Sequence, residues 1–395
     1  MQIYIIGVVN MKLIVGNDIG NSVTKMYVGD TLITQPSVVK RLYVKPDVTE
    51  TDVAKNIENL LDELVVNVTS KAIKRSGLYF VGKRANITAD KVENMNIKLG
   101  NKYKHDIPVL MTLSMIAANS IKAAYKTSKK LPVDLKIDVG MTSAIPASEY
   151  SQEKAKYLEG RFTDHTHVVI VSVGEQEVTV QITFNKVKVT QEGVPALYAL
   201  LEGEPAILKL FQKIYGLMIT SPKAFAGKNI LHVDIGDGTT EYIYTKGMNP
   251  VNDACSGERR GVGHATEDAI TMLKEHVGGH LRINRQQFMD ILKDTSHNLH
   301  ESAERFMEEA RFSEAQKILE DVQEKYMTKT AGNVDYILVY GGGSIVFHEE
   351  LYQELLDFAE QVQCKVIYVP EGMAVNMNAT GMKVLNQKVL FKKTS

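Results

Sequence analysis

The chain of 395 residues is long enough for two domains, and its 44% hydrophobic content can fill two cores. Its 46 basic and 47 acidic residues leave a formal net charge of −1, so no overall positive field would hold the protein on a phosphate backbone. Direct, sequence-independent binding of nucleic acid is therefore not expected.

The cysteines and the apolar segments exclude several other classes of protein. Cys255 and Cys364 lie far apart without metal-ligating neighbours, so neither a disulfide framework nor a zinc site is predicted, and a reducing cytoplasm fits. Residues 1–10 are apolar but too short for a membrane span, and they lack the features of a signal peptide. We interpret them as an N-terminal extension, because Met11 opens a more natural strand. No other stretch approaches the roughly 20 apolar residues of a membrane helix, so no membrane contact is expected.

The first half of the chain predicts a sheet that begins with a hairpin. Alternating apolar residues indicate strands, the first two joined by a tight Gly-Asn turn, at Lys12–Asp18, Ser22–Val28 and Leu32–Val39. Helices are predicted next at Ala54–Asn67, Val109–Tyr125 and Ser148–Leu158. Strands are predicted between them at Leu78–Gly82 and Val133–Val139. Two strands and a helix complete this half, at Val168–Val173, Glu177–Val189 and Val194–Leu201.

The second half repeats the opening pattern. Another hairpin, around a Gly-Asp-Gly turn, is predicted from the strands Asn229–Asp234 and Thr240–Thr245. Three helices follow, at Thr266–His276, Arg285–Lys293 and Asn298–Met327. A buried strand, a helix, a strand and a last helix end the chain, at Tyr336–Tyr340, Glu349–Gln361, Lys365–Val369 and Met373–Leu385. Two such hairpins imply two similar sheets, and without a low-complexity linker the two halves should be closely coupled.

The first hairpin carries a pattern suited to a phosphate group. Its incoming strand delivers a carboxylate, small residues allow backbone N–H groups to approach an anion, and a lysine on the returning strand can neutralise phosphate charge. The residues assigned to phosphate binding are Asp18, Gly20, Asn21, Ser22 and Lys25. The alternative is an ordinary turn in which Lys25 is a solvated surface charge.

The second hairpin repeats the order of carboxylate, glycine, small polar turn and outgoing strand. The residues assigned to it are Asp234, Gly236, Asp237, Gly238, Thr239 and Thr240. A single Asp-Gly hairpin is common, but two with an acidic residue ending the incoming strand suggest paired jaws on one phosphate chain. Each jaw offers a carboxylate, Asp18 or Asp234, to Mg²⁺ or its waters, since magnesium keeps several waters and takes few protein oxygens.

A third motif follows a buried apolar strand. Glycines at the start of a helix permit a flat group or a phosphate to lie against the backbone, and here they are Gly341, Gly342 and Gly343. The alternative is a strand-to-helix turn that merely requires glycine.

In this order and spacing, the three motifs resemble the phosphate-1, phosphate-2 and adenosine segments of the superfamily of actin, sugar kinases and heat-shock chaperones. The resemblance covers nearly the whole chain. It implies that Asp18 is the magnesium-side aspartate and Lys25 the phosphate lysine. Asp234 aligns without a gap, but Glu241 stands where actins carry a histidine that orders the attacking water. Gly263, in a turn before a helix, resembles a position near the nucleotide sugar.

The segment Val189–Leu197 is similar to the stretch that leads into the helix connecting the two domains, where relatives carry a catalytic Glu or Gln. The resemblance therefore makes Glu192 and Asp234 the candidate catalytic residues, with Gln191 as the fallback. A carboxylate near a water in line with the γ-phosphate can orient that water and accept its proton. The alternative for Glu192 is a solvated acid at a helix start.

The resemblance implies an α/β, actin-like ATPase fold, with two ribonuclease H-like domains of mixed five-stranded sheets flanked by helices around a nucleotide cleft. The second connecting helix is similar to residues 370–381 and returns the chain to the first domain. The expected boundaries are 11–200 with 366–395 for domain I, 201–365 for domain II and 1–10 for the extension.

Short connecting loops and the segments Leu78–Ala85 and Val194–Tyr198 are closer to bacterial actin-like proteins of plasmid segregation, the ParM and Alp family. This resemblance implies a cytoplasmic ATPase that binds ATP, with GTP as an alternative, and Mg²⁺. It also implies a head-to-tail filament of identical subunits. A ParR-like DNA-binding adaptor on a centromere-like plasmid site would make the DNA contact. Two other functions stay open: a small-molecule, sugar-type kinase of the same fold, and a non-polymerising nucleotide-dependent binding module.

Overall fold

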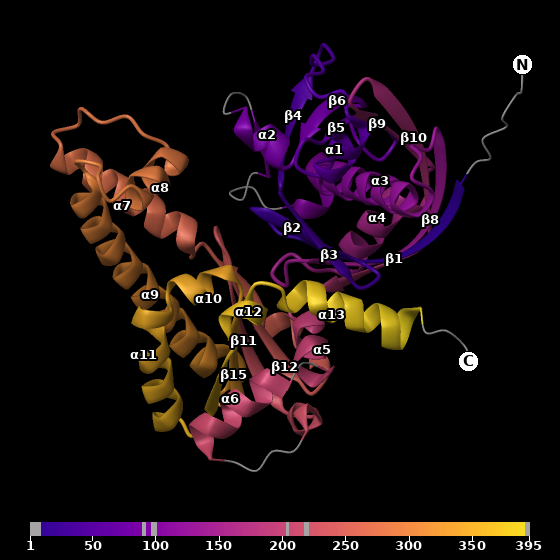
Figure 1. Cartoon of the computed structure of the whole chain (residues 1–395). Coiled ribbons are helices and arrows are strands. Elements are labelled where there is room, and N and C mark those ends of the chain that lie inside the picture. Colours follow the sequence, from indigo (N-terminus) through magenta and orange to yellow (C-terminus); the bar gives the residue numbers. More distant parts are fainter. Residues whose placement is uncertain (1–8, 89–91, 96–100, 203–204, 217–220, 392–395) are drawn as a thin grey trace, which may run out of the picture. The chain divides into compact units, whose positions relative to one another are not determined.

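The computed structural model describes residues 9–88, 92–95, 101–202, 205–216 and 221–391. Contacts within the chain divide it into two compact units, each described here by itself (Figure 1). Unit 1 comprises Met1–Ile145, Glu149–Pro195 and Asn378–Ser395, and unit 2 comprises Pro146–Ser148 and Ala196–Met377. These boundaries differ from the expected ones, because residues 196–200 and 366–377 have apolar side chains that pack with the second sheet.

Unit 1 is built on a ten-stranded mixed sheet among its described residues. The strands in chain order are β1 (Val9–Ile19), β2 (Val23–Val28), β3 (Thr31–Pro36), β4 (Val38–Leu42), β5 (Val65–Thr69), β6 (Gly77–Val81), β7 (Glu93–Asn94), β8 (Asp134–Ile145), β9 (His167–Val173) and β10 (Gln176–Gln191). Their order across the sheet is β3-β2-β1-β8-β10-β9-β5-β6-β4-β7. The central strands β1, β8 and β10 are parallel, whereas the other pairings are antiparallel.

Most helices of unit 1 pack on this sheet around its main apolar core, and Ala85 belongs to a small separate cluster with Val65 and Phe80. The helices are α1 (Val53–Glu58), α2 (Lys83–Ile87), the 3₁₀ turn η2 (Lys102–Lys104), α3 (Asp106–Ser128), α4 (Gln152–Thr163), α13 (Met377–Leu385) and the π-helical turn η5 (Asn386–Leu390). In α3, Asp106 favours the helix start through the helix dipole, and Pro108 is tolerated because it lies in the first turn. Lys129, in the left-handed conformation, ends the helix.

The helix α3 corrects the expectation that no further stretch is long and apolar enough for a membrane span. By length and composition α3 meets that description among the described residues. However, 83% of its apolar window is buried inside the structure, where it packs against β1, β9 and β10. Such burial is typical of the core helix of a globular unit.

Unit 2 contains a smaller, six-stranded mixed sheet among its described residues. Its strands are β11 (Asn229–Ile235), β12 (Thr240–Lys246), β13 (Asn249–Pro250), β14 (Ser256–Glu258), β15 (Tyr336–Tyr340) and β16 (Lys365–Tyr368). The path runs β13-β12-β11-β15-β16, and β14 pairs with β12. The strands β11, β15 and β16 are parallel, so their carboxyl ends share one edge.

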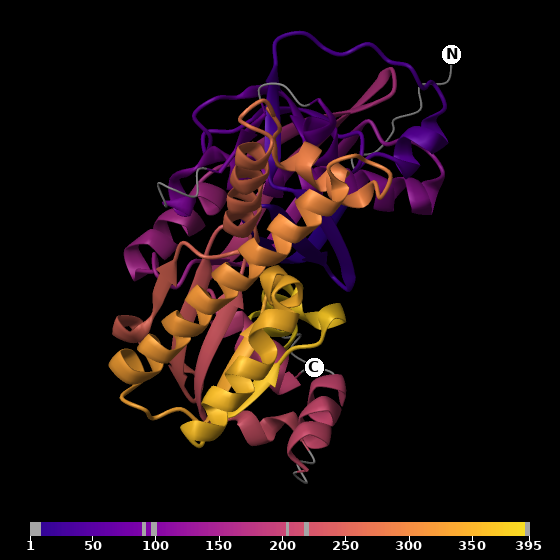
Figure 2. The same ribbon diagram turned by 90° about the vertical axis from the view of Figure 1, so that its left-hand side faces the viewer.

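Helices cover both faces of the unit 2 sheet (Figures 1 and 2). One face packs on α7 (Val262–His276), α8 (Arg285–Lys293), α9 (His300–Thr330) and α11 (His348–Gln361). The other packs on α5 (Val194–Glu202), α6 (Pro205–Tyr215) and α12 (Glu371–Ala374). Short turns complete the unit at η3 (Pro222–Phe225), η4 (Asn252–Ala254) and α10 (Gly342–Val346). A capping box of Asn284 and Gln287 explains the start of α8.

Several predicted elements differ from the structure. The helix predicted over 54–67 was wrong beyond residue 58, because the chain turns after α1 and residues 65–69 form the buried strand β5. The first hairpin leads into two short strands, β3 and β4, instead of the single strand predicted at Leu32–Val39. Among the described residues, the sheets also contain ten and six strands rather than five each. In the first sheet β4 to β7 lengthen the edge beyond β9, and in the second the short strands β13 and β14 both pair with β12.

The interpretation of residues 1–10 as an extension was wrong for its last two residues. The strand β1 begins at Val9, and Val9 and Asn10 pair with Leu135 and Lys136 of β8. The rest of that segment, residues 1–8, lies outside the described residues.

The packing of α13 generates a stability prediction. Gly381 lies so close to Pro195 that an added Cβ would overlap the Pro195 carbonyl oxygen. We expect Gly381→Ala to lower the free energy of unfolding by about 1–3 kcal/mol, the usual cost of overpacking, as measured by chemical denaturation. Gly372→Ala is the matched control, since nothing lies within 4 Å of its added Cβ. Equal stability of the two variants would contradict the proposed contact.

Candidate functional site

The first hairpin of unit 1 places Asp18 and Lys25 directly opposite each other. They are paired in register across β1 and β2, and Lys25 Nζ lies 3.9 Å from an Asp18 carboxylate oxygen. The Asp18 side chain is only 11% exposed. In the turn, Gly20 and Asn21 are half-buried and Ser22 is exposed. The five residues assigned to this hairpin are therefore brought together.

Hydrogen bonds to buried hydroxyl groups hold this turn in place. Ser37 Oγ donates to the carbonyl oxygen of Gly20 at 2.6 Å and is also 2.9 Å from Thr24 Oγ1. The Ser37 N–H donates to the Ser22 carbonyl at 2.9 Å. An added Cβ on Gly20 would lie 2.5 Å from the Val23 carbonyl oxygen, so glycine is required there. Sequence reasoning missed Ser37, which lies between β3 and β4, because no local pattern relates this position to the turn.

Parallel strand pairing brings Glu192 to the same edge as Asp18. Asn17 of β1 pairs with Ser143 of β8, and Ile145 of β8 pairs with Gln191, the last residue of β10. Glu192 follows β10, and its N–H donates to the Ile145 carbonyl at 2.9 Å. The carboxyl ends of parallel strands form the usual ligand edge of a sheet. Gln191, the fallback candidate, is buried, with 2% exposure, whereas Glu192 is half-buried.

A lysine that sequence reasoning missed contacts Glu192. Lys102 Nζ donates to Glu192 Oε1 at 2.9 Å, and the two side chains are 7% and 12% exposed. Burial raises the pKa of Glu192, and the Asp18 charge acts in the same direction, against the lowering by the Lys102 ammonium. For Lys102, burial acts to lower the pKa, but the charges of Glu192 and Asp18 outweigh it, and the pKa lies above its ordinary value.

In unit 2, the second hairpin is joined to the start of α7. Asp234 pairs with Glu241 in register, and the Gly236 N–H closes the turn by donating to the Thr239 carbonyl at 2.9 Å. Gly263 lies in the first turn of α7 rather than before the helix, and its N–H donates to the Asp237 carbonyl at 2.8 Å, so the start of α7 is in direct contact with this hairpin. The other assigned residues of the hairpin, Gly238 and Thr240, are buried, and Thr239 is half-buried.

The three glycines also reach this hairpin, because β11 and β15 are parallel neighbours with Asp234 opposite Tyr340. Gly341 has a φ of 94°, and its added Cβ would lie 2.6 Å from Asp234 Oδ1. Gly343 is similarly crowded by Ile235, whereas nothing lies within 4 Å of an added Cβ on Gly342. Unit 2 therefore brings all of its assigned residues to one edge.

Glu241, which stands where actins carry a histidine, has partners of its own within unit 2. Its carboxylate accepts hydrogen bonds from the N–H and Oγ of Ser148, at 3.1 and 3.0 Å. The residue is only 5% exposed, and Gly257 leaves room for its side chain. Glu241 therefore has a structural contact with the segment 146–148.

The carboxylates of Asp18 and Asp234 suit a magnesium ion that keeps several of its waters, rather than a metal enclosed by protein ligands. Among the residues that the structure describes, no group of three or more His, Cys, Asp and Glu side chains is arranged to hold a metal. Asp18 and Asp234 instead each end an inner strand beside a tight turn. A single carboxylate with space for water is the arrangement that Mg²⁺ accepts when phosphates supply further ligands.

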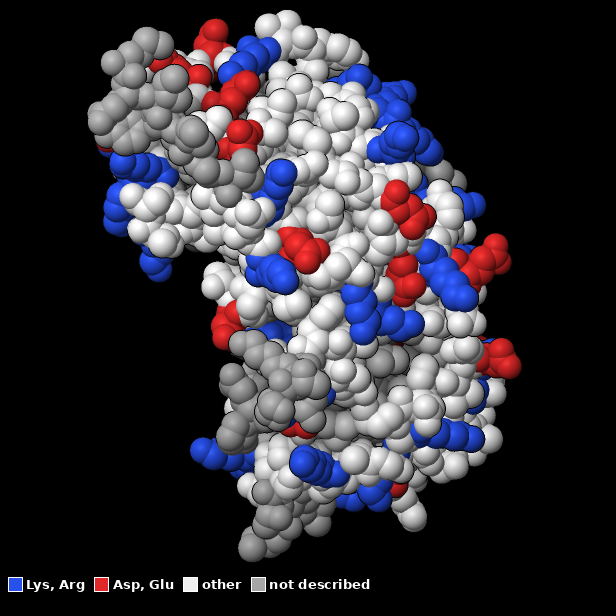
Figure 3. All heavy atoms as spheres, turned by 90° about the vertical axis from the view of Figure 1, so that its right-hand side faces the viewer, with Lys and Arg blue, Asp and Glu red and all other residues white. Residues whose placement is uncertain are grey.

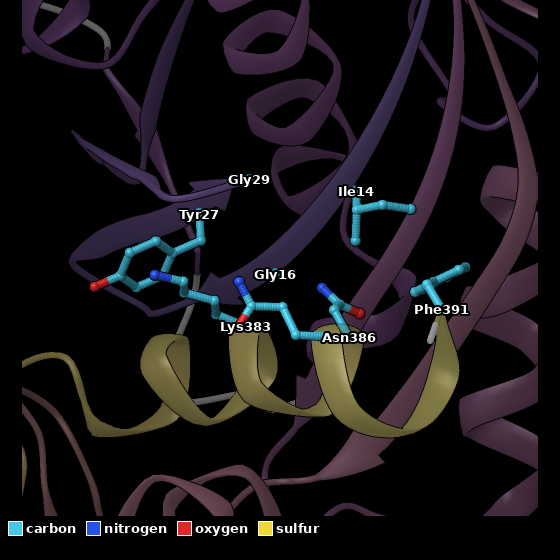
Figure 4. A pocket seen from close by; sticks show the side chains of 8 residues that line it. Ile14, Gly16, Tyr27, Gly29, Lys383, Asn386 and Phe391 are labelled. Atoms are coloured by element: carbon cyan, nitrogen blue, oxygen red, sulfur yellow. The ribbon is translucent and has the colours of Figure 1, made fainter. Parts of the chain in front are cut away.

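Unit 1 also has a pocket of about 410 Å³ (Figure 4). It lies between the β1–β2 hairpin and the end of the chain and is lined by Ile14, Gly16, Tyr27, Gly29, Lys383, Asn386, Gln387 and Phe391. Lys383 pairs with Asp30 at 2.7 Å and lies over the Tyr27 ring. None of the residues predicted for nucleotide binding lines this pocket.

Two family profiles match the chain. The N-terminal domain of actin-like proteins matches residues 16–194, and the C-terminal domain of archaeal MreB-like actin homologues matches residues 232–353. Together they include both hairpins and the Glu192 segment. A search of curated proteins found no match.

Solved structures with similar folds cover almost the whole chain. The actin-like protein Alp7A has a TM-score of 0.68 at 15% identity, covering 95% of this chain and 96% of its own. ParM of Bacillus thuringiensis with ATP has a TM-score of 0.62 at 15% identity, covering 95% and 98%. A 15-stranded ParM filament from Clostridium botulinum has a TM-score of 0.63 at 16% identity, covering 94% and 97%. The predicted actin-like fold is therefore confirmed.

The glycine turn gives a prediction that is independent of any ligand. We expect Gly341→Ala to reduce the free energy of unfolding by about 1–3 kcal/mol, because its Cβ would crowd Asp234 and Ile235 at a positive φ. Thermal or urea unfolding measures this loss. Gly342→Ala, with open space around the added methyl group, should leave stability nearly unchanged. A Gly342→Ala variant that is as unstable as Gly341→Ala would refute this description of the turn.

Proposed function

Because the chain belongs to the actin-like proteins, we propose that it binds and hydrolyses ATP and that the nucleotide controls its assembly into filaments. The observation that carries the proposal is the repeated hairpin. Each unit ends an inner strand with a carboxylate, Asp18 or Asp234, beside a tight turn of small residues.

The phosphate groups would be bound by the turns and by one lysine. Backbone N–H groups of the turns at residues 20–22 and 237–239 are the donors that suit phosphate oxygens, because the Gly236 N–H already donates to the Thr239 carbonyl. Lys25 adds a positive charge, and its contact with Asp18 keeps it beside the turn. The three glycines of residues 341–343 support a role at the adenosine end, since Gly342 leaves open space.

Hydrolysis would depend on Glu192. Its carboxylate would orient a water molecule and accept one of its protons while the water oxygen forms a bond to the γ-phosphorus. The bond from the γ-phosphorus to the oxygen that bridges it to the β-phosphate breaks, and ADP leaves with that bridging oxygen. The proton then passes to phosphate or solvent, so that ATP and water give ADP and phosphate. Positioning and charge neutralisation provide most of the rate in such reactions.

Asp18 and Asp234 are the carboxylates that we propose as ligands of Mg²⁺, mainly through its waters. Bound there, the ion would neutralise phosphate charge as the γ-phosphate is transferred. Asp18 is suited to this role because its side chain is nearly buried beside the turn.

Filament formation is proposed from similarity to relatives. The solved ParM filament of Clostridium botulinum covers 94% of this chain, and ParM of Bacillus thuringiensis was solved with ATP. We propose a head-to-tail filament in the cytoplasm that moves or positions plasmid DNA through a ParR-like adaptor. Side chains of both charges occur on the face drawn in Figure 3, and the net charge is −1, so an adaptor rather than this chain would contact the DNA.

Assembly is tested by light scattering and pelleting of the purified protein with ATP, GTP, ADP and a non-hydrolysable ATP analogue, each with Mg²⁺. We expect ATP and the analogue to produce pellets, because the triphosphate state favours assembly, and ADP to produce fewer. Absence of pelleting across nucleotides and concentrations would contradict the filament proposal. Phosphate release that required an added sugar would favour the kinase alternative, and a nucleotide-binding monomer in sedimentation would favour the binding module.

Glu192→Ala should slow phosphate release by about 100-fold or more, the usual contribution of a general base, while nucleotide binding and pelleting persist. Glu175→Ala is the control, since this glutamate is exposed in the turn between β9 and β10. Hydrolysis at the normal rate by Glu192→Ala would show that the assigned role is wrong.

Asp18→Ala and Asp234→Ala should each weaken binding of the magnesium nucleotide at least about tenfold, the loss expected for one charged contact. Titration of a fluorescent ATP analogue with and without Mg²⁺ measures this. The exposed Asp253 in η4 provides the control variant Asp253→Ala. Unchanged affinity in both Asp18→Ala and Asp234→Ala would remove the paired carboxylates from the proposed site.

A further inference from the structure

The buried lysine beside Glu192 has no role in the function described so far. Lys102 belongs to the short turn η2, whereas Glu192 follows the strand β10, so the contact joins distant parts of unit 1. Its ammonium lies 2.9 Å from Glu192 Oε1 with only 7% of the side chain exposed. Asp18 is close enough to interact electrostatically with both residues.

The backbone around Lys102 is held firmly by other side chains. The Lys102 N–H donates to Glu149 Oε2 at 3.2 Å. Arg161 of α4 donates to the carbonyl oxygens of Tyr103 and His105, at 2.9 and 2.6 Å, and pairs with Asp106 at 3.0 Å. These hydrogen bonds fix the backbone that carries the Lys102 side chain. The ion pair with Lys102 therefore limits where the Glu192 carboxylate can lie.

Stability alone does not readily explain why an ion pair is buried at this position. Removing two charges from water costs several kcal/mol per ion, and well-packed apolar side chains are often as stable at such positions. Unit 1 already has an extensive apolar core that does not include this pair. The pair also lies at the carboxyl edge of β1, β8 and β10, where the proposed chemistry takes place.

We propose that Lys102 is a positioning residue for ATP hydrolysis, whose ammonium holds the Glu192 carboxylate beside Asp18 in the orientation that accepts a proton from the attacking water. This inference rests on the proposed function and adds a residue to it. Lys102 acts through Glu192, so it affects the hydrolytic step rather than the capture of the nucleotide. One of the three ammonium donors is used by Glu192.

The test compares Lys102→Met, Lys102→Arg and the double variant Lys102→Met/Glu192→Ala in steady-state phosphate release and nucleotide titration. We expect Lys102→Met to lower kcat at least about tenfold, as for loss of an oriented base, with affinity for ATP changed less than about threefold. Lys102→Arg should recover part of the rate, because it keeps the charge. In the Glu192→Ala background, Lys102→Met should have no further effect, as a double-mutant cycle requires for residues that act as one unit.

Lys104→Met is the matched control, since Lys104 is an exposed lysine of the same short turn. Circular dichroism and thermal unfolding of every variant separate a loss of rate from a loss of folding. A folded Lys102→Met variant that hydrolyses ATP at the normal rate or faster overturns the inference, and so does an equal further loss of rate in the Glu192→Ala background. Failure of the proposed function looks different, because the unmodified chain would then release no phosphate.

Discussion

Parallel strand pairing is the constraint on which the rest of the structure depends. In unit 1, β8 lies between β1 and β10, and the shared direction of these strands brings Asp18 and Glu192 to one edge. In unit 2, the pairing of β11 with β15 does the same for Asp234 and Gly341. A shift of one residue in either register would turn these side chains to the opposite face of the sheet. The apolar faces of the buried strands set the strand register, and the register determines where the residues at the strand ends lie.

The hairpins could be predicted from sequence because they are local. An acidic residue that ends an apolar strand, followed by a tight turn and a returning strand, is contained in about ten residues. The register of Asp18 with Lys25, and of Asp234 with Glu241, follows from such a short turn. Glu192 was found through resemblance rather than spacing, and its place at the edge of the sheet depends on pairing with a distant strand.

The features that could not be predicted from the sequence depend on contacts between distant parts of the chain. The order of the ten strands in unit 1 depends on pairings such as β5 with β9, which no local periodicity encodes. Residues 65–67, which begin the strand β5, were assigned to the helix predicted at 54–67, because a short apolar run satisfies helical and strand spacing equally well. Lys102 gave no signal at all, since a lysine in an irregular segment is usually solvated. Its contact with Glu192, 90 residues away, depends on the fold that places the two side chains together.

The charges at the edge of unit 1 have a consequence for the form of nucleotide that can approach. Asp18, Glu149 and Glu192 bring three carboxylates near two ammonium groups, those of Lys25 and Lys102. This small region is negative on balance although the whole chain is close to neutral. Free ATP would meet electrostatic repulsion there, whereas a metal-complexed triphosphate carries less negative charge and brings its own counter-ion. In the proposed function, the edge would therefore favour the magnesium complex of the nucleotide over free ATP, and the carboxylates would contribute to this selectivity as well as the lysines.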